Sequence, residues 1–313
     1  MSLNSTQMNK QVIDKYTQRH ELYLEQLLNE IIIPAPQIRS ALHYALFSGG
    51  KRIRPILVYL AGDLIDVDQG VLDIIAAALE LTHCYSLIHD DLPAMDNDDL
   101  RRGKPSCHKA FDEATAILVG DGMQALAIEV LLMRLSPLLP AAQVVAITQV
   151  LVNASGISGM VSGQSLDLSE LAKSSVTEEQ LREIHLLKTG KLILACFEMV
   201  LAAQHEVSEQ IKSALRTYGK HIGLVFQMQD DYLDLYAPTQ ILGKGRSSDQ
   251  ANQKTTFATL FNKQQLEEEI AVHYQIAMDS LRLFGSKAAA LIELTKQLQN
   301  RSNLSEGHHH HHH

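Results

Sequence analysis

The sequence has few of the residues that cross-link or interrupt a chain. Among its 313 residues are eight prolines and three cysteines, Cys84, Cys107 and Cys196. An odd and sparse set of cysteines without metal-ligand spacing argues against a disulfide scaffold or a zinc domain, and it indicates buried thiols in a reducing cytoplasm. Because proline is scarce and β-branched residues do not alternate with polar ones, we expect helices rather than strands.

Excess positive charge and long uninterrupted apolar runs are also lacking. The formal net charge is -9, which argues against nucleic acid as a partner. No uninterrupted apolar run approaches about 18 residues, so we expect no membrane span, and no signal peptide is recognised. The six terminal histidines after Glu306-Gly307 are read as an expression tag, as Met1-Ser2-Leu3 could also be, and both are set aside.

Apolar residues make up 46% of the chain, enough to fill a sizeable core. Their helical spacing predicts helices over 8–31, 38–47, 56–64, 71–91, 114–135, 141–152, from a capping box at Thr177 onward, 218–235, 264–282 and 287–299. No linker composition separates them. We therefore expect an all-α bundle of ten or more helices forming a single domain over residues 4–305, followed by the tag at 306–313.

Two aspartate-rich stretches each follow an apolar helical run. They contain Asp90, Asp91 and Asp96 in the first and Asp230, Asp231 and Asp234 in the second. Carboxylates crowded on one helix face repel one another unless water or cations separate them. Mg²⁺ prefers oxygen ligands and usually completes its shell with substrate phosphates. A single cluster is ordinarily a solvated helix end, whereas two clusters indicate a diphosphate held between two carboxylate walls.

Cationic residues are placed to meet such phosphates. Two glycines precede Lys51, Arg52 and Arg54, so close backbone approach and bidentate arginine contacts are both available. Lys188 interrupts an apolar helix, and a buried lysine needs an anion. Each feature can also be explained without a ligand. Basic residues after a turn usually face water, and a lysine in an apolar helix can extend its ammonium group to the surface.

The chain resembles the trans-prenyl (polyprenyl) diphosphate synthases, most of all the bacterial farnesyl diphosphate synthases. The resemblance extends over nearly the whole chain and rests on seven motifs in the family's order: 49–55, 86–96, 100–103, 163–167, 188–190, 227–234 and 243–244. It implies the isoprenoid synthase fold, an all-helical bundle around a deep central cavity, and usually a homodimer. It implies condensation of isopentenyl diphosphate with dimethylallyl and geranyl diphosphate, head-to-tail through an allylic carbocation.

The resemblance also assigns roles to residues. Three Mg²⁺ ions, with Mn²⁺ as a substitute, are expected on Asp90, Asp96 and Asp230, supported by Asp91, Asp231 and Asp234. The allylic diphosphate is expected on Arg101, Lys188 and Lys244. Isopentenyl diphosphate is expected on Lys51, Arg54, His83, Arg102 and Arg301. The carbocation is expected to face Lys188, Thr189 and Gln227.

In this family, the residues four and five positions before the first aspartate form the floor of the cavity, and product length depends on them. Here they are Ser86 and Tyr85. An ideal helix places His83, Ser86 and Asp90 in one stripe and Tyr85 off it. Tyr85 nevertheless lies about 7–8 Å below Asp90 along the helix axis, a depth that suits a product of fifteen carbons. We expect farnesyl diphosphate, with a geranyl or geranylgeranyl product as the alternative.

Other classes of protein fit less well. A di-iron bundle needs two Glu-x-x-His motifs, and the core offers one, at Glu80–His83. A terpene cyclase lacks a second diphosphate site, which leaves Lys51, Arg54 and Arg102 unexplained. A non-catalytic homologue usually loses aspartates from one motif, and both are intact here. A metal-dependent phosphohydrolase built on His89 and Asp90 remains as a remote alternative.

Overall fold

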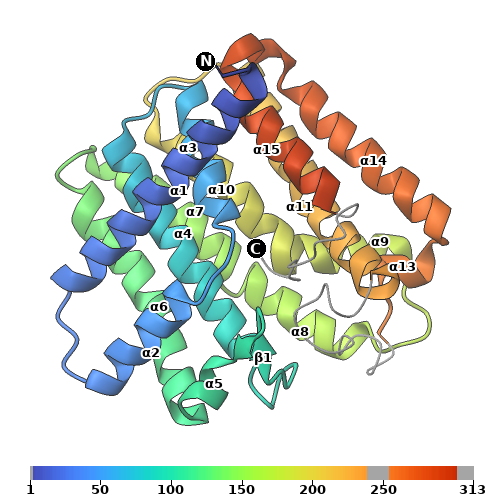
Figure 1. The fold of residues 1–313 in the computed structure, drawn as a ribbon, viewed down its shortest axis with the longest axis horizontal. Coiled ribbons are helices and arrows are strands. Elements are labelled where there is room, and N and C mark those ends of the chain that lie inside the picture. The colour runs from blue at the N-terminus through green and yellow to red at the C-terminus, as the bar shows by residue number, and fades with distance from the viewer. Residues whose placement is uncertain (1–2, 238–253, 302–313) are drawn as a thin grey trace.

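Nearly all of the secondary structure is helical in the computed structural model, which describes residues 3–237 and 254–301 (Figure 1). In chain order the elements are α1 (Ser5–Glu30), α2 (Pro36–Phe47), α3 (Ile53–Leu64), α4 (Gln69–Asp90), β1 (Leu100–Arg101), β2 (Lys104–Pro105), α5 (Cys107–Ala110), α6 (Glu113–Leu135), α7 (Ala141–Ser155), α8 (Met160–Glu170), α9 (Glu178–His185), η1 (Leu186–Gly190), α10 (Lys191–Ala203), α11 (Glu209–Tyr236), α13 (Phe257–Leu260), α14 (Lys263–Ser280), η3 (Arg282–Ala288) and α15 (Ala289–Asn300). The predicted all-α fold is confirmed.

Helix α4 is the central helix and it delivers the first aspartates. The Asp68 side chain caps its first turn by accepting a hydrogen bond from the Gly70 amide. The helix packs against α1, α3, α6 and α10, and the fully buried alanines 76–78 allow these neighbours to approach closely. Because the surrounding helices fix α4 on all sides, Asp90 at its last turn has a fixed position.

Helix α11 carries the second aspartates and is flanked by α14 and α15 (Figure 1). It begins at Glu209, well before the predicted start at residue 218, because Ser208 caps a first turn whose outer side is polar. Periodicity of apolar residues cannot detect such a turn. The other end agrees with the prediction to within a residue, and Asp230, Asp231 and Asp234 lie in the last two turns.

Two local structures differ from the prediction. In a fold where only helices were expected, a small antiparallel hairpin pairs Leu100 with Pro105 and Arg101 with Lys104. The single helix expected after Thr177 is divided into α9, the π-helical segment η1 and α10. A π-helical turn adds a residue to the helix and is frequent at functional sites. It contains Lys188 and Thr189.

Among the described residues, three segments are long and apolar enough, by length and composition, to cross a membrane: Gln69–Asp90, Glu113–Leu135 and Ala141–Glu170. No uninterrupted apolar run approaches this length, but single polar residues interrupt the apolar stretches without lowering their average hydropathy much, so the segments meet the criterion by length and composition alone. The apolar stretch of the first is wholly buried, whereas 39% and 33% of the other two is buried. All three cysteines are unpaired and buried, as predicted.

Candidate active site

The first aspartate wall forms where α4 ends. Asp90 is 5% exposed, and burial raises its pKa to about 7 although the charge of Lys188 opposes this shift. The Gln164 side chain of α8 donates a hydrogen bond to its carboxylate. The following loop folds back on the helix end, where the Asp96 amide donates to the Asp90 carbonyl at 2.8 Å. This backbone contact keeps Asp96 beside Asp90.

Asp91 faces away from this pair and forms an ion pair with Arg101 of the hairpin. The Arg101 Nε and Nη2 atoms donate to the two Asp91 carboxylate oxygens at 2.8 and 2.7 Å. Asp91 is 2% exposed, so this bidentate contact fixes the hairpin against α4. The geometry fits a supporting role for Asp91, and it places Arg101 at the edge of the first wall.

The second wall is formed by the last turns of α11. Burial raises the pKa of Asp230 to about 7, against the opposing charge of Arg301. Asp231 accepts hydrogen bonds from the Phe257 amide at 2.8 Å and from the Gln227 side chain at 2.9 Å. It therefore holds α13, which follows the segment 238–253, against α11. Asp234 is 5% exposed and lies one turn further along.

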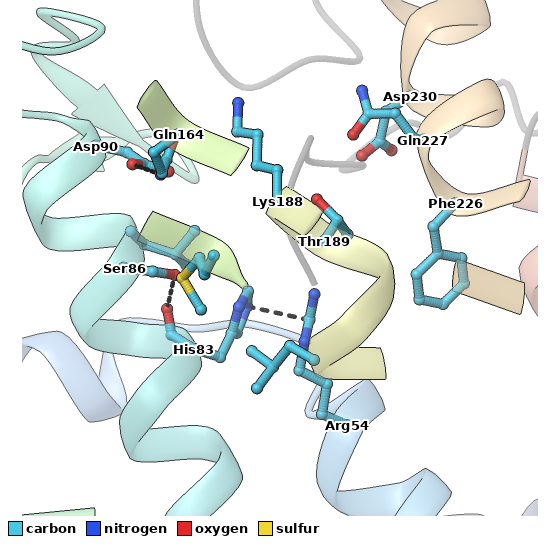
Figure 2. Close-up of a pocket in the computed structure, with 13 residues that line it drawn as sticks. Arg54, His83, Ser86, Asp90, Gln164, Lys188, Thr189, Phe226, Gln227 and Asp230 are labelled. Atoms are coloured by element: carbon cyan, nitrogen blue, oxygen red, sulfur yellow. Dashed lines mark hydrogen bonds between the residues drawn. The ribbon is translucent and has the colours of Figure 1, made fainter. Parts of the chain in front are cut away.

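The segment η1 lies between the two walls, and Gly163 of α8 determines how closely it packs. A Cβ atom at Gly163 would lie 2.3 Å from the Lys188 amide nitrogen, so only glycine allows the two backbones to touch. Figure 2 shows Asp90 on one side of the cavity, Asp230 and Gln227 on the other, and Lys188 and Thr189 between them. The close packing of α8 and η1 at Gly163 therefore fixes where Lys188 lies.

Lys188 shares a carboxylate with a second lysine. Its ammonium group forms an ion pair with Asp167 of α8, and Lys254 Nζ lies 2.9 Å from the other oxygen of that carboxylate. Burial alone would raise the pKa of Asp167, but the charges of Lys188 and Lys254 outweigh burial and lower it. Sequence reasoning assigned no role to Asp167 or Lys254. In the sequence, Lys254 begins a Lys-Thr-Thr-Phe stretch that comes after the basic, glycine-rich residues 243–249.

A group of buried cations lies below the carboxylates. Arg54 Nη1 is 3.3 Å from His83 Nε2, and burial lowers the pKa of Arg54 and keeps His83 neutral by lowering its pKa well below the usual value. The Arg102 side chain lies flat on Gly49 and Gly50, both at positive φ, where a Cβ at Gly50 would be 3.0 Å from the guanidinium. Arg52 points elsewhere and is paired with Glu21 and Glu80.

Arg301 joins this group from the end of α15. It is 1% exposed, its Nη2 atom is 3.2 Å from Asp230, and its guanidinium lies over the Phe226 ring. Burial lowers the pKa of Lys51 to about 8, and the charge of Arg301 lowers it further in the same direction. Three guanidinium nitrogens are buried with no hydrogen-bond partner among the described residues: Arg54 Nε, Arg102 Nε and Arg301 Nη1. Such donors need a hydrogen-bond acceptor, and the oxygens of a diphosphate are suitable acceptors.

A second, larger cavity of about 520 Å³ extends from Asp90 between α4, α6 and α8. Tyr85, Ser86 and His89 of α4 line it together with Ile117, Met160 and Val161, so its wall is mostly apolar. The helical stripe His83, Ser86 and Asp90 lines the first cavity, as predicted. Ser86 lines both cavities, whereas Tyr85 lines only the second, where its ring packs edge-on against His89.

The structure thus brings together every described residue that the sequence assigned to the site. Lys244 lies outside the described residues. Within residues 3–237 and 254–301, no group of three or more His, Cys, Asp or Glu side chains is arranged to hold a metal ion by itself. The carboxylates lie on two separate walls, so a divalent cation placed between them needs further oxygen ligands. Substrate phosphates supply such ligands.

Comparisons with known proteins agree on one family. The polyprenyl synthetase family model matches residues 35–289. The farnesyl diphosphate synthase of Haemophilus influenzae is 42% identical over 81% of this chain and 86% of its own length. A geranyltransferase structure from Legionella pneumophila is 95% identical, with a TM-score of 0.90, over 96% of this chain and 100% of that one. A Helicobacter pylori geranyltransferase complexed with magnesium and isoprenyl diphosphate is 30% identical, with a TM-score of 0.78, over 97% and 99%.

Proposed function

The chain belongs to the polyprenyl synthetase family and is a prenyltransferase, and from that premise we propose how its residues act. It joins isopentenyl diphosphate to dimethylallyl and then geranyl diphosphate to give farnesyl diphosphate. The observation that carries this function is that one carboxylate from each wall, Asp90 and Asp230, lines the same cavity as the buried cation Arg54. Two carboxylate walls suit a diphosphate bridged by metal ions, and the buried guanidinium groups of Arg54, Arg102 and Arg301 suit a second diphosphate that binds without metal.

We propose that Asp90, Asp96 and Asp230 hold Mg²⁺ directly, with three ions in the loaded site, and that Mn²⁺ can replace it. The pKa of about 7 for Asp90 and Asp230 fits this role, because a buried carboxyl that lacks a cation is readily protonated. Asp91, Asp231 and Asp234 support them from the second layer. The bound ions supply Lewis-acid stabilisation of the charge that develops on the leaving diphosphate.

The chain's own cations share that task. Lys188, Arg101 and Lys244 hold the allylic diphosphate, and their fixed charges favour ionisation of the allylic C–O bond. The Gln227 amide nitrogen donates to Asp231, which leaves its carbonyl oxygen as the end available to the cavity. That oxygen, the Thr189 hydroxyl and the main-chain carbonyls of Lys188 and Thr189 stabilise the carbocation by their dipoles without capturing it. Water must be excluded because it would convert the cation to an alcohol.

The second substrate, isopentenyl diphosphate, is held by Lys51, Arg54, His83, Arg102 and Arg301. Its double bond attacks the carbocation, and the released diphosphate takes the proton that is lost. No separate side-chain base is needed for this step. The growing chain extends into the 520 Å³ cavity, where Tyr85 and Ser86 form the floor and stop elongation at fifteen carbons.

We also propose that the chain is a cytoplasmic homodimer whose protomers each form one domain over residues 4–305. Exposed apolar side chains are concentrated on α6, α7 and α8, among them Leu118, Met133, Val145 and Val161. Monomeric soluble proteins rarely expose large apolar patches, and homodimer interfaces are more apolar than other surfaces. A second copy of the chain is the occupant that fits this surface.

Product analysis tests the proposed function. The purified protein is incubated with isopentenyl diphosphate, Mg²⁺ and either dimethylallyl or geranyl diphosphate, and the dephosphorylated alcohols are sized by chromatography. A dominant fifteen-carbon product is expected, and it should disappear with EDTA and in the Asp90→Asn variant. A twenty-carbon product would retain the synthase and reject the proposed floor. Phosphate release without elongation would reject the synthase in favour of a phosphohydrolase.

A further inference from the structure

The side chain of Gln229 connects the second aspartate stretch to the C-terminal helix. Gln229 lies on α11, immediately before Asp230, and is 0% exposed. Its Nε2 atom donates to the carbonyls of Leu298 and Gln299, both at 3.1 Å. Its Oε1 atom accepts from Arg301 Nε at 2.8 Å and from the Tyr274 hydroxyl of α14. Both hydrogens and both lone pairs of the amide are therefore used.

These four contacts have a specific consequence for α15. The last carbonyls of a helix have no partner within the helix, and a buried helix end is stable only if other groups satisfy them. Gln229 supplies two of those partners and at the same time fixes the arginine directly after the helix. The Arg301 guanidinium is thus held over Phe226 and beside Asp230, and its Nη1 atom has no hydrogen-bond partner in the described part of the chain.

We propose that Gln229 is a positioning residue for the isopentenyl diphosphate site, acting through Arg301. This inference rests on the proposed function, because it assumes that Arg301 contacts that substrate. A buried arginine that is already oriented loses little conformational freedom when the diphosphate arrives. Without the amide, the end of α15 loses two hydrogen bonds and Arg301 loses the partner of its Nε atom.

The chemistry of the amide explains why the isosteric acid cannot replace it. A glutamate at position 229 would still accept from Arg301 and Tyr274. Its second oxygen would face the carbonyls of Leu298 and Gln299 and could donate to neither of them in its ionised form. The end of α15 would lose its two hydrogen bonds while Arg301 kept an anionic partner. Gln229→Glu therefore separates the contact with the helix end from the contact with Arg301.

Steady-state kinetics test the proposal. In Gln229→Met we expect the KM for isopentenyl diphosphate to rise about 10- to 100-fold, the loss typical of one charge-assisted contact, while the KM for geranyl diphosphate stays within about twofold. Tyr274→Phe keeps the shape of the core and should give a smaller rise in the same KM. Gln297→Met makes the same chemical change on the exposed face of α15 and should leave both constants unchanged.

A double-mutant cycle separates positioning from general damage. If Gln229 acts through Arg301, then Gln229→Met should raise the KM no further in an Arg301→Met background. Hydrogen exchange of the amides in residues 294–301 gives a readout without substrate, and it should accelerate in Gln229→Met and Gln229→Glu but not in Gln297→Met. If the parent protein is active and Gln229→Met changes the KM for both substrates equally, this inference is overturned. Additive effects of the two substitutions in the cycle would overturn it as well. An inactive parent would instead overturn the proposed function.

Discussion

Lys254 illustrates how a single residue can belong to a site without a recognisable pattern. Its ammonium group and that of Lys188 share Asp167, and its side chain is only 8% exposed. Lys188 also lies close enough to Asp90 for each charge to shift the pKa of the other, so the two lysines and Asp167 adjoin the first aspartate wall. We therefore assign Lys254 to the allylic half of the site, together with Lys188.

The Lys254→Met variant tests this assignment. Removing one cation beside the leaving diphosphate should lower kcat/KM for geranyl diphosphate roughly 10- to 100-fold, while leaving the KM for isopentenyl diphosphate little changed. Lys10→Met removes an exposed lysine from α1 and serves as the matched control. Unchanged kinetics in Lys254→Met would limit this lysine to a structural contact with Asp167.

Tyr85 tests the proposed floor of the cavity. The side chain is 6% exposed and lines the cavity of about 520 Å³ together with Ser86. Tyr85→Ala should shift the main product from fifteen to twenty or more carbons, because the chain can then extend past the vacated ring. Tyr85→Phe keeps the ring and should keep the fifteen-carbon product. Product sizing decides the matter, and an unchanged product in Tyr85→Ala would remove Tyr85 as the floor.

A residue could be assigned to the site from the sequence when its role depends on residues that are its near neighbours in the chain. The six aspartates could be proposed as metal ligands because they form two clusters of neighbouring carboxylates, each directly after an apolar helical run. Gln229 and Asp167 could not be assigned in this way, because an amide or a carboxylate acquires its role only from partners distant in the chain: Gln229 contacts residues 45 to 72 positions away and Asp167 contacts Lys254, 87 positions away. Such partners are defined by the packing of helices and not by spacing.

Among the elements, the crossing of α8 and η1 is tightly constrained by backbone packing. A Cβ at Gly163 would approach the Lys188 backbone to 2.3 Å, and one at Gly223 of α11 would lie 3.0 Å from the Gly190 Cα. Backbone atoms cannot move aside as a flexible side chain can. The position of η1, and hence of Lys188 and Thr189, therefore depends on glycine in the helices on both sides.

Gly163→Ala should displace η1 and lower both stability and activity. We expect a loss of about 1–3 kcal/mol in the free energy of unfolding, from overpacking, and a kcat reduced at least about tenfold. Denaturant unfolding and steady-state rates measure the two effects. The comparison is Gly122→Ala on α6, where a Cβ meets no atom within 4 Å and where stability should not fall. A Gly163→Ala variant with full activity would contradict the proposed role of this crossing.

Helix α1 contains a buried histidine, His20, that should make the stability of the fold depend on pH. His20 is 0% exposed, neither ring nitrogen has a hydrogen-bond partner among the described residues, and burial lowers its pKa to about 3 despite the nearby charge of Glu80. Arg52 also lies close and favours the neutral ring. Because the folded-state pKa lies below the unfolded value of about 6.5, the neutral ring stabilises the fold above that value and the contribution is lost as pH falls.

His20→Leu should therefore reduce the sensitivity of the fold to acid. Between pH 7.5 and 5.0 the parent should lose about 2 kcal/mol more stability than the variant, the amount expected for one histidine that is neutral when folded and protonated when unfolded. Denaturant unfolding at both pH values, at one protein concentration, gives the difference. His205→Leu changes an exposed histidine and should behave like the parent. Equal losses in the parent and in His20→Leu would show that His20 is not held neutral.

Helices themselves were largely predictable, and their irregularities were not. Apolar periodicity located α4, α6 and α14 to within two residues at each end, because each has an apolar side that packs against neighbouring helices. The π-helical segment and the hairpin at Leu100–Pro105 follow from contacts with α8 and with Asp91, which local sequence does not encode. The sequence therefore predicted residues of the candidate site. The positions of their side chains relative to one another became known only from the structure.

The molecule as a whole leaves an apolar surface uncovered. Only 39% of the apolar stretch in Glu113–Leu135 and 33% of that in Ala141–Glu170 is buried, and Leu118 and Met133 of α6 are 58% and 67% exposed. By composition alone, these segments could also cross or contact a membrane. Two features favour a second copy of the chain. The apolar stretch of the adjoining α4 is wholly buried within the protein, and the surface is formed by helices that a two-fold partner can match.

The Leu118→Arg variant distinguishes a second copy of the chain from a membrane as the partner of this surface. A buried arginine without a partner is costly at an interface, so the variant should dissociate the dimer and give the 34.7 kDa mass of one chain by size exclusion with light scattering. Leu22→Arg places the same charge on α1, where leucine is 60% exposed, and should remain dimeric. A parent that is already monomeric would reject the homodimer. If that monomer also floated with phospholipid vesicles, and Leu118→Arg abolished the flotation, the surface would belong to a membrane interface instead.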